Sequence, residues 1–436
     1  MRAETLGNRL KVMIVGAGTG GLCLAQGLKA DGIAVEVFER DYSPTDRLQG
    51  YRLGVNETGR RALKECLPDS LFDKLVACCA NPSRVVTFLD HRLNRLLNIE
   101  LEPDEQNDLP VSRMSLRGVL LEGLDQIVCF GKKFIAFEQA PSGAITARFE
   151  DGSTATGDVL IGADGASSRV RGQLLPYAER VETGILAVSG KIAMTRAVRK
   201  ATPEAFLRGP TLVLGPKGRF MFGSAVEYGN PDDMARGDFE PPTTRLATEL
   251  PSDSGREQYV MWGFSAPREA FAMPADFGAL GAEDLKSRVM ALTTDWAPAL
   301  RHLVEAAQPA TITAFPIKTS VPIPPWYTRN VTLVGDALHN MTPYRGIGAN
   351  TALRDAAALR QALRAVDRGE NGLIPALAAY EREMVDYGFR AVRASLRNME
   401  RFHAQGRLTR AFTKLFFRTI DAAPPLKAAF LGRRSD

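Results

Sequence analysis

Cysteine and histidine are scarce in this sequence, and their spacing excludes several kinds of site. The 436 residues include five cysteines and four histidines. The cysteines stand at positions 23, 66, 78, 79 and 129, so they form no CxxC pair and no histidine cluster accompanies them. Structural zinc sites and disulfide frameworks depend on such spacings. We therefore expect a reduced, cytoplasmic protein without a metal centre.

Long apolar runs and a basic body are also absent. No apolar run reaches the roughly 18 residues that span a bilayer. The first apolar segment, residues 12–15, breaks into glycines, which is typical of a strand and not of a signal peptide. Residues 401–436 hold eight Lys and Arg against two Asp, a local charge of +6 that leaves the rest of the chain near −1. A neutral body argues against nucleic-acid binding.

The sequence does contain alternating strand and helix patterns at its start, a β-rich middle and a helical end. Residues 11–40 predict a strand, a glycine-rich turn, a helix and a second strand. Residues 181–265 are β-rich, with turn residues between the strands. After residue 350 apolar residues recur at steps of three and four, which places them on one helix face. This order predicts an α/β chain of two domains, the first interrupted by the second.

The first motif is GAGTGG at residues 16–21, a GxGxxG between a strand and a helix. Gly16 permits the tight turn, Gly18 lets a pyrophosphate approach the backbone, and Gly21 lets the helix pack on the strand. The helix N-terminus then offers unpaired N–H groups to the phosphates. Glu39 stands about twenty residues on, where a carboxylate accepts ribose hydroxyls. The motif predicts binding of FAD or NAD, since a glutamate here disfavours a 2′-phosphate.

Two further motifs follow strands later in the chain. Residues 157–171, GDVLIGADGASSRVR, end a buried strand at Asp164, which taken alone is equally well an exposed turn residue. Residues 331–354, VTLVGDALHNMTPYRGIGANTALR, run from a strand through Asp336 and a turn containing Pro343, Gly346 and Gly348 into a helix. That turn permits close approach of a flat ring. The helix N-terminus stabilises negative charge on a reduced flavin.

These three motifs, in this order, resemble those of the group A flavoprotein monooxygenases, the para-hydroxybenzoate hydroxylase-like enzymes that include many natural-product hydroxylases. The resemblance covers residues 10–400. It implies a single-component enzyme in which NADPH or NADH reduces FAD. Oxygen then gives a flavin hydroperoxide, which attacks an electron-rich aromatic or polyketide-like substrate by hydroxylation or epoxidation.

The resemblance also implies a fold. We expect a Rossmann-like, GR2-type FAD-binding domain interrupted by a mixed β-sheet substrate domain, with helices at the C-terminus. The expected FAD-binding domain comprises residues 1–75, 101–180 and 285–400. The expected substrate domain comprises residues 76–100 and 181–284. Residues 401–436 form a basic amphipathic tail.

Carried over position by position, the resemblance implies a set of cofactor-binding residues. Adenosine, pyrophosphate, ribityl and ring contacts are expected from Gly16, Gly18, Gly21, Glu39, Arg40, Arg47, Arg113, Asp164, Asp336, Pro343, Gly346, Gly348, Ala349 and Asn350. Two residues depart from the family pattern. Arg52 stands in a segment that is usually small and glycine-rich, so it either lines the flavin pocket or is exposed. Arg345 either meets a substrate anion or turns to solvent.

The substrate is expected between the flavin and the middle sheet. Aromatic candidates for its walls are Phe220, Phe222, Tyr228, Trp262 and Phe264. Alternation places Phe220 and Phe222 on one face of a strand, and Trp262 and Phe264 share a face as well. Taken singly, each of them fits equally an ordinary core position between sheet and helices. No catalytic base is identified, and His339 is expected to be structural.

Several alternatives remain open from the sequence. The basic tail either docks on the body, caps the active site or a dimer, or lies on an anionic membrane. A flavin-dependent halogenase shares the fold, although its usual WxWxIP segment is missing. A prenyl-reductase-like flavoprotein acting on a lipophilic substrate and a non-catalytic flavin-binding scaffold are the other candidates. Substrate identity, the choice of NADPH or NADH and the oligomeric state are not determined.

Overall fold

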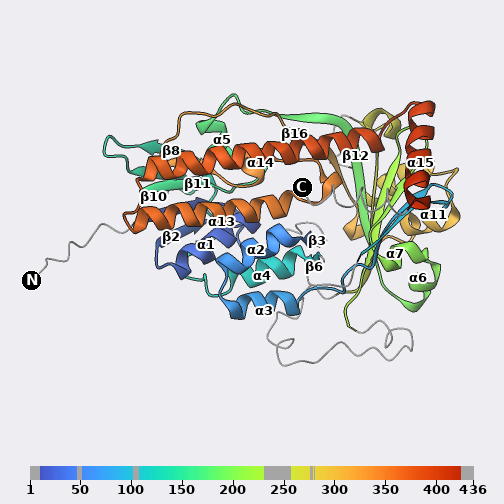
Figure 1. Cartoon of the computed structure of the whole chain (residues 1–436), viewed down its shortest axis with the longest axis horizontal. Helices are drawn as coiled ribbons and strands as arrows, with labels where there is room; N and C mark the ends of the chain where they lie inside the picture. Colours follow the sequence, from blue (N-terminus) through green and yellow to red (C-terminus); the bar gives the residue numbers. More distant parts are fainter. Residues whose placement is uncertain are drawn as a thin grey trace, which may run out of the picture.

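The chain builds two main sheets at opposite ends of the molecule, with long helices running between them (Figure 1). The computed structural model describes residues 10–46, 52–101, 108–229, 257–274, 278 and 280–423. The first sheet contains the glycine-rich turn, and the second contains the β-rich middle of the chain.

The first sheet is parallel throughout, with five strands in the order β17-β11-β1-β2-β7. Its strands are β1 (Lys11–Val15), β2 (Ala34–Phe38), β7 (Val128–Cys129), β11 (Val159–Gly162) and β17 (Val331–Leu333). The strands are nearly continuous apolar runs because helices and a small sheet cover both faces. All five strands point the same way, so their carboxyl ends meet at one edge.

Helices from distant parts of the chain pack around this sheet. α1 begins directly after the glycine-rich turn and contacts both α2 and α13. The helices of this end are α1 (Thr19–Ala30), α2 (Glu57–Cys66), α3 (Asp69–Ala77), α4 (Arg113–Leu121), α5 (Arg169–Leu174), α12 (Asp336–His339), α13 (Gly348–Asp367) and α14 (Leu373–Phe402). Two small antiparallel units complete it: a sheet of β8 (Phe134–Gln139), β9 (Ile145–Phe149) and β10 (Thr154–Gly157), and a ribbon of β3 (Arg52–Val55) and β6 (Leu109–Ser112).

The second sheet has seven strands in the order β16-β12-β15-β14-β13-β4-β5. All neighbours are antiparallel except β13 and β4. Its strands are β4 (Val85–Asp90), β5 (Arg95–Glu100), β12 (Arg180–Ala193), β13 (Thr211–Leu214), β14 (Phe220–Val226), β15 (Tyr259–Pro267) and β16 (Thr313–Ser320).

The two faces of the second sheet meet different partners. One face forms a core with the short helices α7 (Glu204–Arg208), α10 (Ala282–Leu292) and α11 (Pro298–Glu305), the 3₁₀ turn Arg268–Phe271 and neighbouring residues. The other face meets the end of α14, the 3₁₀ turn Pro343–Arg345 and α15 (Arg407–Ala422). We call this second side the FAD-domain face, because it looks toward the parallel sheet. Also at this end lie α6 (Arg196–Ala201) and the 3₁₀ turn Pro309–Thr311.

The interruption expected from the sequence is present, but its second boundary differs. The β4–β5 hairpin joins the second sheet through pairing of β4 with β13. However, β16 pairs with β12 inside the second sheet, and α10 and α11 pack on its core. The chain therefore returns to the parallel sheet at β17 and not at residue 285. Apolar periodicity shows a strand or a helix, but not which distant sheet it joins.

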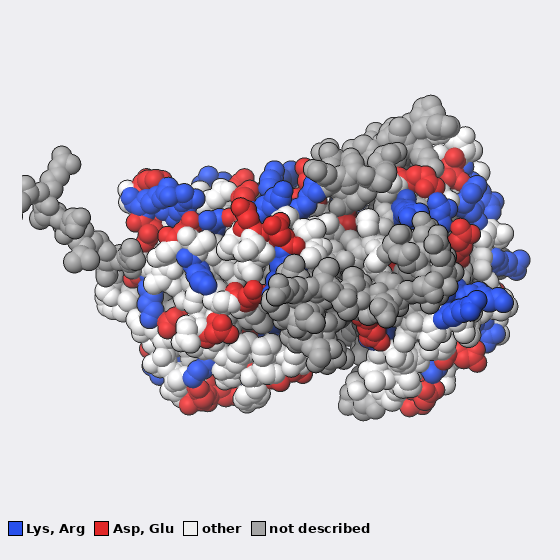
Figure 2. Space-filling model, turned by 90° about the horizontal axis from the view of Figure 1, so that it is seen from below, with Lys and Arg blue, Asp and Glu red and all other residues white. Residues whose placement is uncertain are grey.

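Charges of both signs are interspersed over the described surface in the view from below (Figure 2). Within the part of the chain that the structure describes, no helix combines the length and apolar character that a membrane span requires.

Candidate functional site

The glycine-rich turn joins β1 to α1 at the carboxyl edge of the parallel sheet. Gly16 has a φ of +108°, and a Cβ built on it would stand 2.4 Å from the Ala163 carbonyl oxygen. A Cβ on Gly21 would stand 2.3 Å from the Gly16 oxygen. At Gly18, by contrast, the nearest atom of the described residues is 3.9 Å away. Two glycines thus allow close packing, while Gly18 leaves room for a ligand to approach the helix N-terminus.

Glu39 lies beside this turn, on the side where the sequence predicts the ribose of adenosine. The end of β2 buries its side chain to 7% exposure. Its carboxylate accepts from Ala17 N at 2.7 Å and from Asp41 N at 3.0 Å. The carboxylate therefore lies directly over the glycine turn, with further lone pairs left to accept ribose hydroxyls. Its neighbour Arg40 is exposed, and Arg47 lies outside the described residues.

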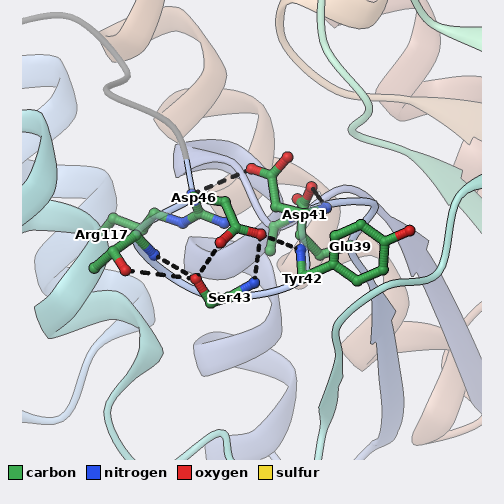
Figure 3. A network of polar contacts seen from close by, with 8 residues as sticks. Glu39, Asp41, Tyr42, Ser43, Asp46 and Arg117 are labelled. Carbon is green, nitrogen blue, oxygen red and sulfur yellow. Dashed lines mark hydrogen bonds and ion pairs between the residues drawn. The ribbon is translucent and has the colours of Figure 1, made fainter.

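A loop held by hydrogen bonds follows Glu39 and lies beside an arginine of α4, Arg117, that the sequence did not single out (Figure 3). Asp46 accepts from the backbone N–H groups of Tyr42 and Ser43 and from the Ser43 hydroxyl. Arg117 reaches from α4 to Asp41, 3.7 Å away, and both side chains are buried. Arg117 stands one helical turn after Arg113, which was the available sequence signal.

Arg113 and Asp336 face one another across the same edge of the sheet. Burial among protein groups lowers the pKa of Arg113, and the Asp336 carboxylate opposes that shift. Both side chains nevertheless remain open to solvent. The two groups are therefore close enough to interact and remain accessible to a ligand. They stand at the start of α4 and just after β17, where the ribityl and pyrophosphate groups were expected.

Asp164, at the end of β11, caps the short helix α5. Its Oδ2 accepts from Arg169 N at 2.7 Å and from Val170 N at 3.3 Å. Its Oδ1 is buried without a hydrogen-bond partner among the described residues. Burial raises the pKa of this carboxyl, although hydrogen bonds to Ser168 and the helix N–H groups oppose that rise.

The third motif is held by a buried polar cluster beneath it. Asp355 on α13 accepts from Gly335 N, from the Tyr387 hydroxyl and from His339 Nε2 at distances of 2.6–2.7 Å. Burial disfavours the charged form of His339, but the Asp355 carboxylate outweighs this and raises the pKa of His339. His339 therefore lies in the core below the turn, a placement consistent with the structural role expected of it.

The turn above that cluster leads into the N-terminus of α13. Pro343 begins the 3₁₀ turn, Gly346 ends it with a φ of +66°, and Gly348 begins α13. A Cβ on Gly346 would meet no atom of the described residues within 4 Å, so the backbone there is open to a ligand. Asn350 accepts from Asn56 N at 3.0 Å and donates to the Gly54 oxygen at 2.9 Å. Its amide therefore ties α13 to β3, which leaves backbone groups near Ala349 for a ring.

Arg52 reaches from β3 to the FAD-domain face of the second sheet. Its Nη1 donates to Ser224 Oγ at 3.2 Å and to the Ala225 oxygen at 3.4 Å, and its Nη2 donates to Ser83 Oγ at 3.2 Å. Burial lowers its pKa. The sequence left two alternatives for Arg52, a place in the flavin pocket or full exposure to solvent. The structure does not show the exposed alternative. Arg345 is half-buried in the turn itself.

The aromatic candidates divide between the two faces of the second sheet. Phe220 and Phe222 lie on the FAD-domain face, and Phe222 is half-buried. Tyr228 lies beside Tyr259 in a small cluster that also contains Ala80, from the segment between α3 and β4. Trp262 and Phe264 are fully buried on the opposite face, against the α10–α11 core. The structure thus places these last two in the core and apart from the flavin turn, because alternation fixes a shared face but not which face.

A second buried polar cluster, missed from the sequence, joins the flavin turn to the second sheet. The Tyr344 hydroxyl lies 2.6 Å from His403 Nε2 and 3.0 Å from Ser265 Oγ. His403 Nδ1 lies 2.6 Å from the Gly218 oxygen, to which it donates. Burial lowers the pKa of His403 to about 4, so the ring is neutral and Nε2 accepts from Tyr344. These partners come from four separate elements, so no local sequence pattern could have shown them.

This arrangement fits a dinucleotide that carries a flat ring. Glu39 after β2, the open approach at Gly18 after β1 and Asp336 after β17 lie at the carboxyl edge of one sheet, and the open turn at Gly346 follows Asp336 in the chain. Two helix N-termini, those of α1 and α13, point to that edge and favour negative charge there.

Comparisons with known proteins identify relatives of this chain. A family model described as an FAD binding domain matches residues 291–395. The 6-methylsalicylate 1-monooxygenase atA of Aspergillus terreus is 30% identical, and the match covers 86% of this chain and 79% of that protein. A solved structure of an FAD-containing monooxygenase from Photorhabdus luminescens matches with a TM-score of 0.79 and 31% identity, over 91% of this chain and 100% of that chain.

Another relative is longer than this chain. The dual O-methyltransferase/FAD-dependent monooxygenase CTB3 of Cercospora beticola is 32% identical over 393 residues. The match covers 86% of this chain but only 44% of that protein. The chain therefore spans less than half the length of that relative.

Proposed function

The chain belongs to the family of FAD-dependent monooxygenases, with FAD as its cofactor, and from this premise we propose its reaction. It uses NADPH or NADH and O₂ to hydroxylate a small aromatic or polyketide-like molecule of secondary metabolism. Epoxidation is the second outcome of the same chemistry. The bound cofactor supplies the redox step and the activation of oxygen. The protein supplies binding, orientation and exclusion of water.

The observation that carries the proposal is that three accessible positions stand in segments that follow strands of one parallel sheet. Gly18 caps the N-terminus of α1 after β1, Asp336 follows β17 and acts on Arg113, and Gly346 opens the turn before α13. We assign the pyrophosphate to the first position, the ribityl chain to the second and the isoalloxazine ring to the third. Glu39 holds the ribose of the adenosine half.

The substrate then lies between the turn at residues 343–348 and the FAD-domain face of the second sheet. Phe222 supplies an aromatic wall on that face. The relative from Aspergillus terreus is named for 6-methylsalicylate, a small aromatic acid, which supports an aromatic substrate here. The five free cysteines support a reducing, cytoplasmic setting.

Relatives named as monooxygenases favour this reading over the halogenase and prenyl-reductase alternatives. The scaffold alternative is tested directly by turnover. The test is the visible absorption spectrum of the purified protein, recorded without oxygen as NADPH is added. We expect a flavin spectrum that bleaches, and that bleaches faster when a suitable aromatic compound is present.

Two outcomes would contradict the proposal. A flavin spectrum that NADPH and NADH both leave unchanged would point to a separate reductase, and hence to a halogenase or a scaffold. A protein that binds no FAD when FAD is added would remove the cofactor assignment itself. Incorporation of ¹⁸O from ¹⁸O₂ into the product then tests oxygen transfer, and the structure of that product separates hydroxylation from epoxidation.

A further inference from the structure

The FAD-domain face of the second sheet has an unfilled position at its centre. β14 and β15 pair so that Phe222 stands opposite Gly263, Ser224 opposite Met261, and Phe220 opposite Ser265. Paired residues share a face, so these side chains all point toward the FAD-binding domain. A Cβ built on Gly263 would meet no atom of the described residues within 4 Å. The middle pair of the three is therefore open.

The two ends of this row are held by different parts of the FAD-binding domain. At one end Tyr344, from the flavin turn, bonds Ser265 and packs on Phe220 with ring centroids 5.5 Å apart. At the other end Arg52, from β3, bonds Ser224. Pairs of one face repeat every two residues, about 7 Å along a strand. The space over Gly263 thus lies one step from the flavin turn and one step from a guanidinium.

The charge and hydrogen bonds of the guanidinium at that end decide what it can bind. Arg52 bonds three neutral oxygens, those of Ser224, Ala225 and Ser83. Within the described parts of the chain no carboxylate forms an ion pair with it, although Asp108 acts on it at longer range. A guanidinium has five N–H groups, and these three bonds use three of them. Two N–H groups are left for an acceptor, which is the number that one carboxylate takes in a bidentate pair.

Arg52 is half-buried, and a partly desolvated cation with no ion-pair partner among the described residues gains from a ligand that supplies one. Ser224 and Ser83 hold the guanidinium against the second sheet, so it is fixed in place before any ligand arrives. A fixed, half-buried arginine beside an aromatic side chain and an open backbone position has the composition of a small-molecule site, with one polar group that sets orientation.

We propose that Arg52 binds an anionic oxygen of the substrate, whose aromatic ring lies over Gly263 against Phe222. The anionic oxygen is a carboxylate or an ionised phenol. This inference rests on the proposed function and deepens it, because it defines the substrate as an acidic aromatic molecule. Arg52 would be an orienting residue that directs the far side of the ring toward the flavin turn at Tyr344.

The test measures binding of two matched pairs of probes to the FAD-loaded protein, from the perturbation of the flavin spectrum. The pairs are benzoate with benzamide, and ionised 4-nitrophenol with 4-nitroanisole. The wild type should prefer the charged member of at least one pair. Arg52→Gln should weaken that member roughly 10- to 100-fold and the neutral member less than about threefold. Which pair responds distinguishes a carboxylate from a phenolate.

Three further variants locate the effect. Arg52→Lys should retain part of the preference, because it keeps the charge without the planar fork. Gly263→Val should weaken both members of a pair equally, because its side chain fills the space over residue 263 without contacting the Arg52 guanidinium. Arg148→Gln is the matched control, since Arg148 pairs with Glu138 on the exposed three-stranded sheet. It should change neither pair.

The FAD dissociation constant, from quenching of flavin fluorescence, separates a cofactor role from a substrate role. It should stay within about threefold of the wild type in Arg52→Gln. A loss of FAD affinity, an equal loss of charged and neutral probes, or a wild type without charge preference would each overturn the assignment of Arg52. Failure of FAD binding or of NADPH bleaching in the wild type would instead overturn the proposed function.

Discussion

At the residue scale, Gly16, Gly18 and Gly21 of the first turn have different structural roles. A Cβ at Gly21 would press on the Gly16 backbone at 2.3 Å, whereas a Cβ at Gly18 would come no closer than 3.9 Å to any described atom. Gly18 also has a φ of −83°, which alanine adopts without strain. Substitutions at Gly18 and Gly21 therefore distinguish an effect on ligand binding from an effect on folding.

We expect Gly18→Ala to leave the thermal stability of the apoprotein unchanged and to raise the FAD dissociation constant at least about tenfold, because the added methyl occupies the phosphate approach. Gly21→Ala should lower the free energy of unfolding of the apoprotein by about 1–3 kcal/mol, because backbone must move. Calorimetry without FAD and fluorescence titration with FAD measure the two effects. Equal loss of stability in both variants would contradict the separation.

A buried histidine predicts a difference in stability between acid and neutral pH. Burial lowers the pKa of His403 to about 4 in the folded protein, below the value near 6.5 of an unfolded histidine. Between these values the unfolded chain binds more protons, so the stability that neutral His403 contributes is complete above about 6.5 and is lost as the pH falls toward about 4. The shift corresponds to about 3 kcal/mol at most.

His403→Gln should remove that part of the slope, since glutamine still accepts from Tyr344 but does not titrate in this range. The measurement is the free energy of unfolding in urea at several values between pH 4 and 7. A variant with the same slope as the wild type would show that His403 is not buried as a neutral ring.

Residues whose role depends on local chain geometry were predictable from the sequence. The glycines and Glu39 stand at fixed offsets from a strand, so the motif placed them at one sheet edge before the fold was known. Arg52 was identified as a departure from the family pattern, but its burial against the second sheet depends on a distant segment. Tyr344, Ser265 and His403 meet only through folding, and no spacing relates them.

At the element scale, α15 docks through a face that its sequence pattern did not indicate. Leu408, Phe412 and Leu415 recur at helical spacing as an apolar stripe, yet these side chains are 61–76% exposed. The docked side instead contains Phe417, whose ring centroid lies 4.8 Å from that of Phe88, and Ile420. Asp421 adds a bond from Asn98 N at 3.0 Å. Docking on β4 and β5 therefore uses few residues.

We expect Phe417→Ala to lower the free energy of unfolding by about 2–4 kcal/mol, because a buried ring is removed. Phe412→Ala, its matched control on the exposed stripe, should change it by less than about 0.5 kcal/mol. Urea unfolding measures both. If Phe412→Ala were the more destabilising change, the exposed stripe would be covered in solution by another copy or segment.

Co-sedimentation with anionic vesicles tests the alternative that the basic tail lies on a membrane. A protein left in the supernatant excludes that alternative.

Element types were more predictable than element partners. The parallel strands, the long C-terminal helices and the β-rich middle all appear where the periodicity indicated them. The assignment of β16, α10 and α11 to the second sheet was not visible, since strand pairing between β12 and β16 joins residues more than a hundred positions apart. The periodicity of the sequence predicts the local conformation of a segment, whereas long-range packing decides which domain that segment joins.

At the scale of the whole molecule, the active site is expected where two domains meet, so its geometry depends on contacts between them. α14 runs from the parallel-sheet end to the second sheet (Figure 1). His403 follows its last residue and holds Tyr344 of the flavin turn. Arg52 makes a second link from β3 to β14. Both links join the FAD-binding elements to the same face of the second sheet.

Loss of the Tyr344 hydroxyl should loosen the first link without removing the cofactor. Tyr344→Phe removes the bonds to His403 Nε2 and Ser265 Oγ, which keep their mutual contact at 3.3 Å, so it should cost about 0.5–1.5 kcal/mol of stability. A turn that moves relative to the sheet also positions substrate poorly. We therefore expect FAD affinity to be retained, while more hydrogen peroxide is released per NADPH oxidised in the presence of the aromatic compound that most accelerates bleaching.

Tyr380→Phe provides a control of similar cost, because the buried Tyr380 hydroxyl donates to the Leu333 oxygen and the ring lies in the core around the parallel sheet. It should lower stability to a comparable degree and leave the ratio of peroxide to NADPH unchanged. If both variants raised peroxide release equally, the effect would follow from general loss of stability. If neither did, the Tyr344 link would not control how the flavin turn meets the substrate. Only a rise confined to Tyr344→Phe ties oxygen transfer to the contact between the two domains.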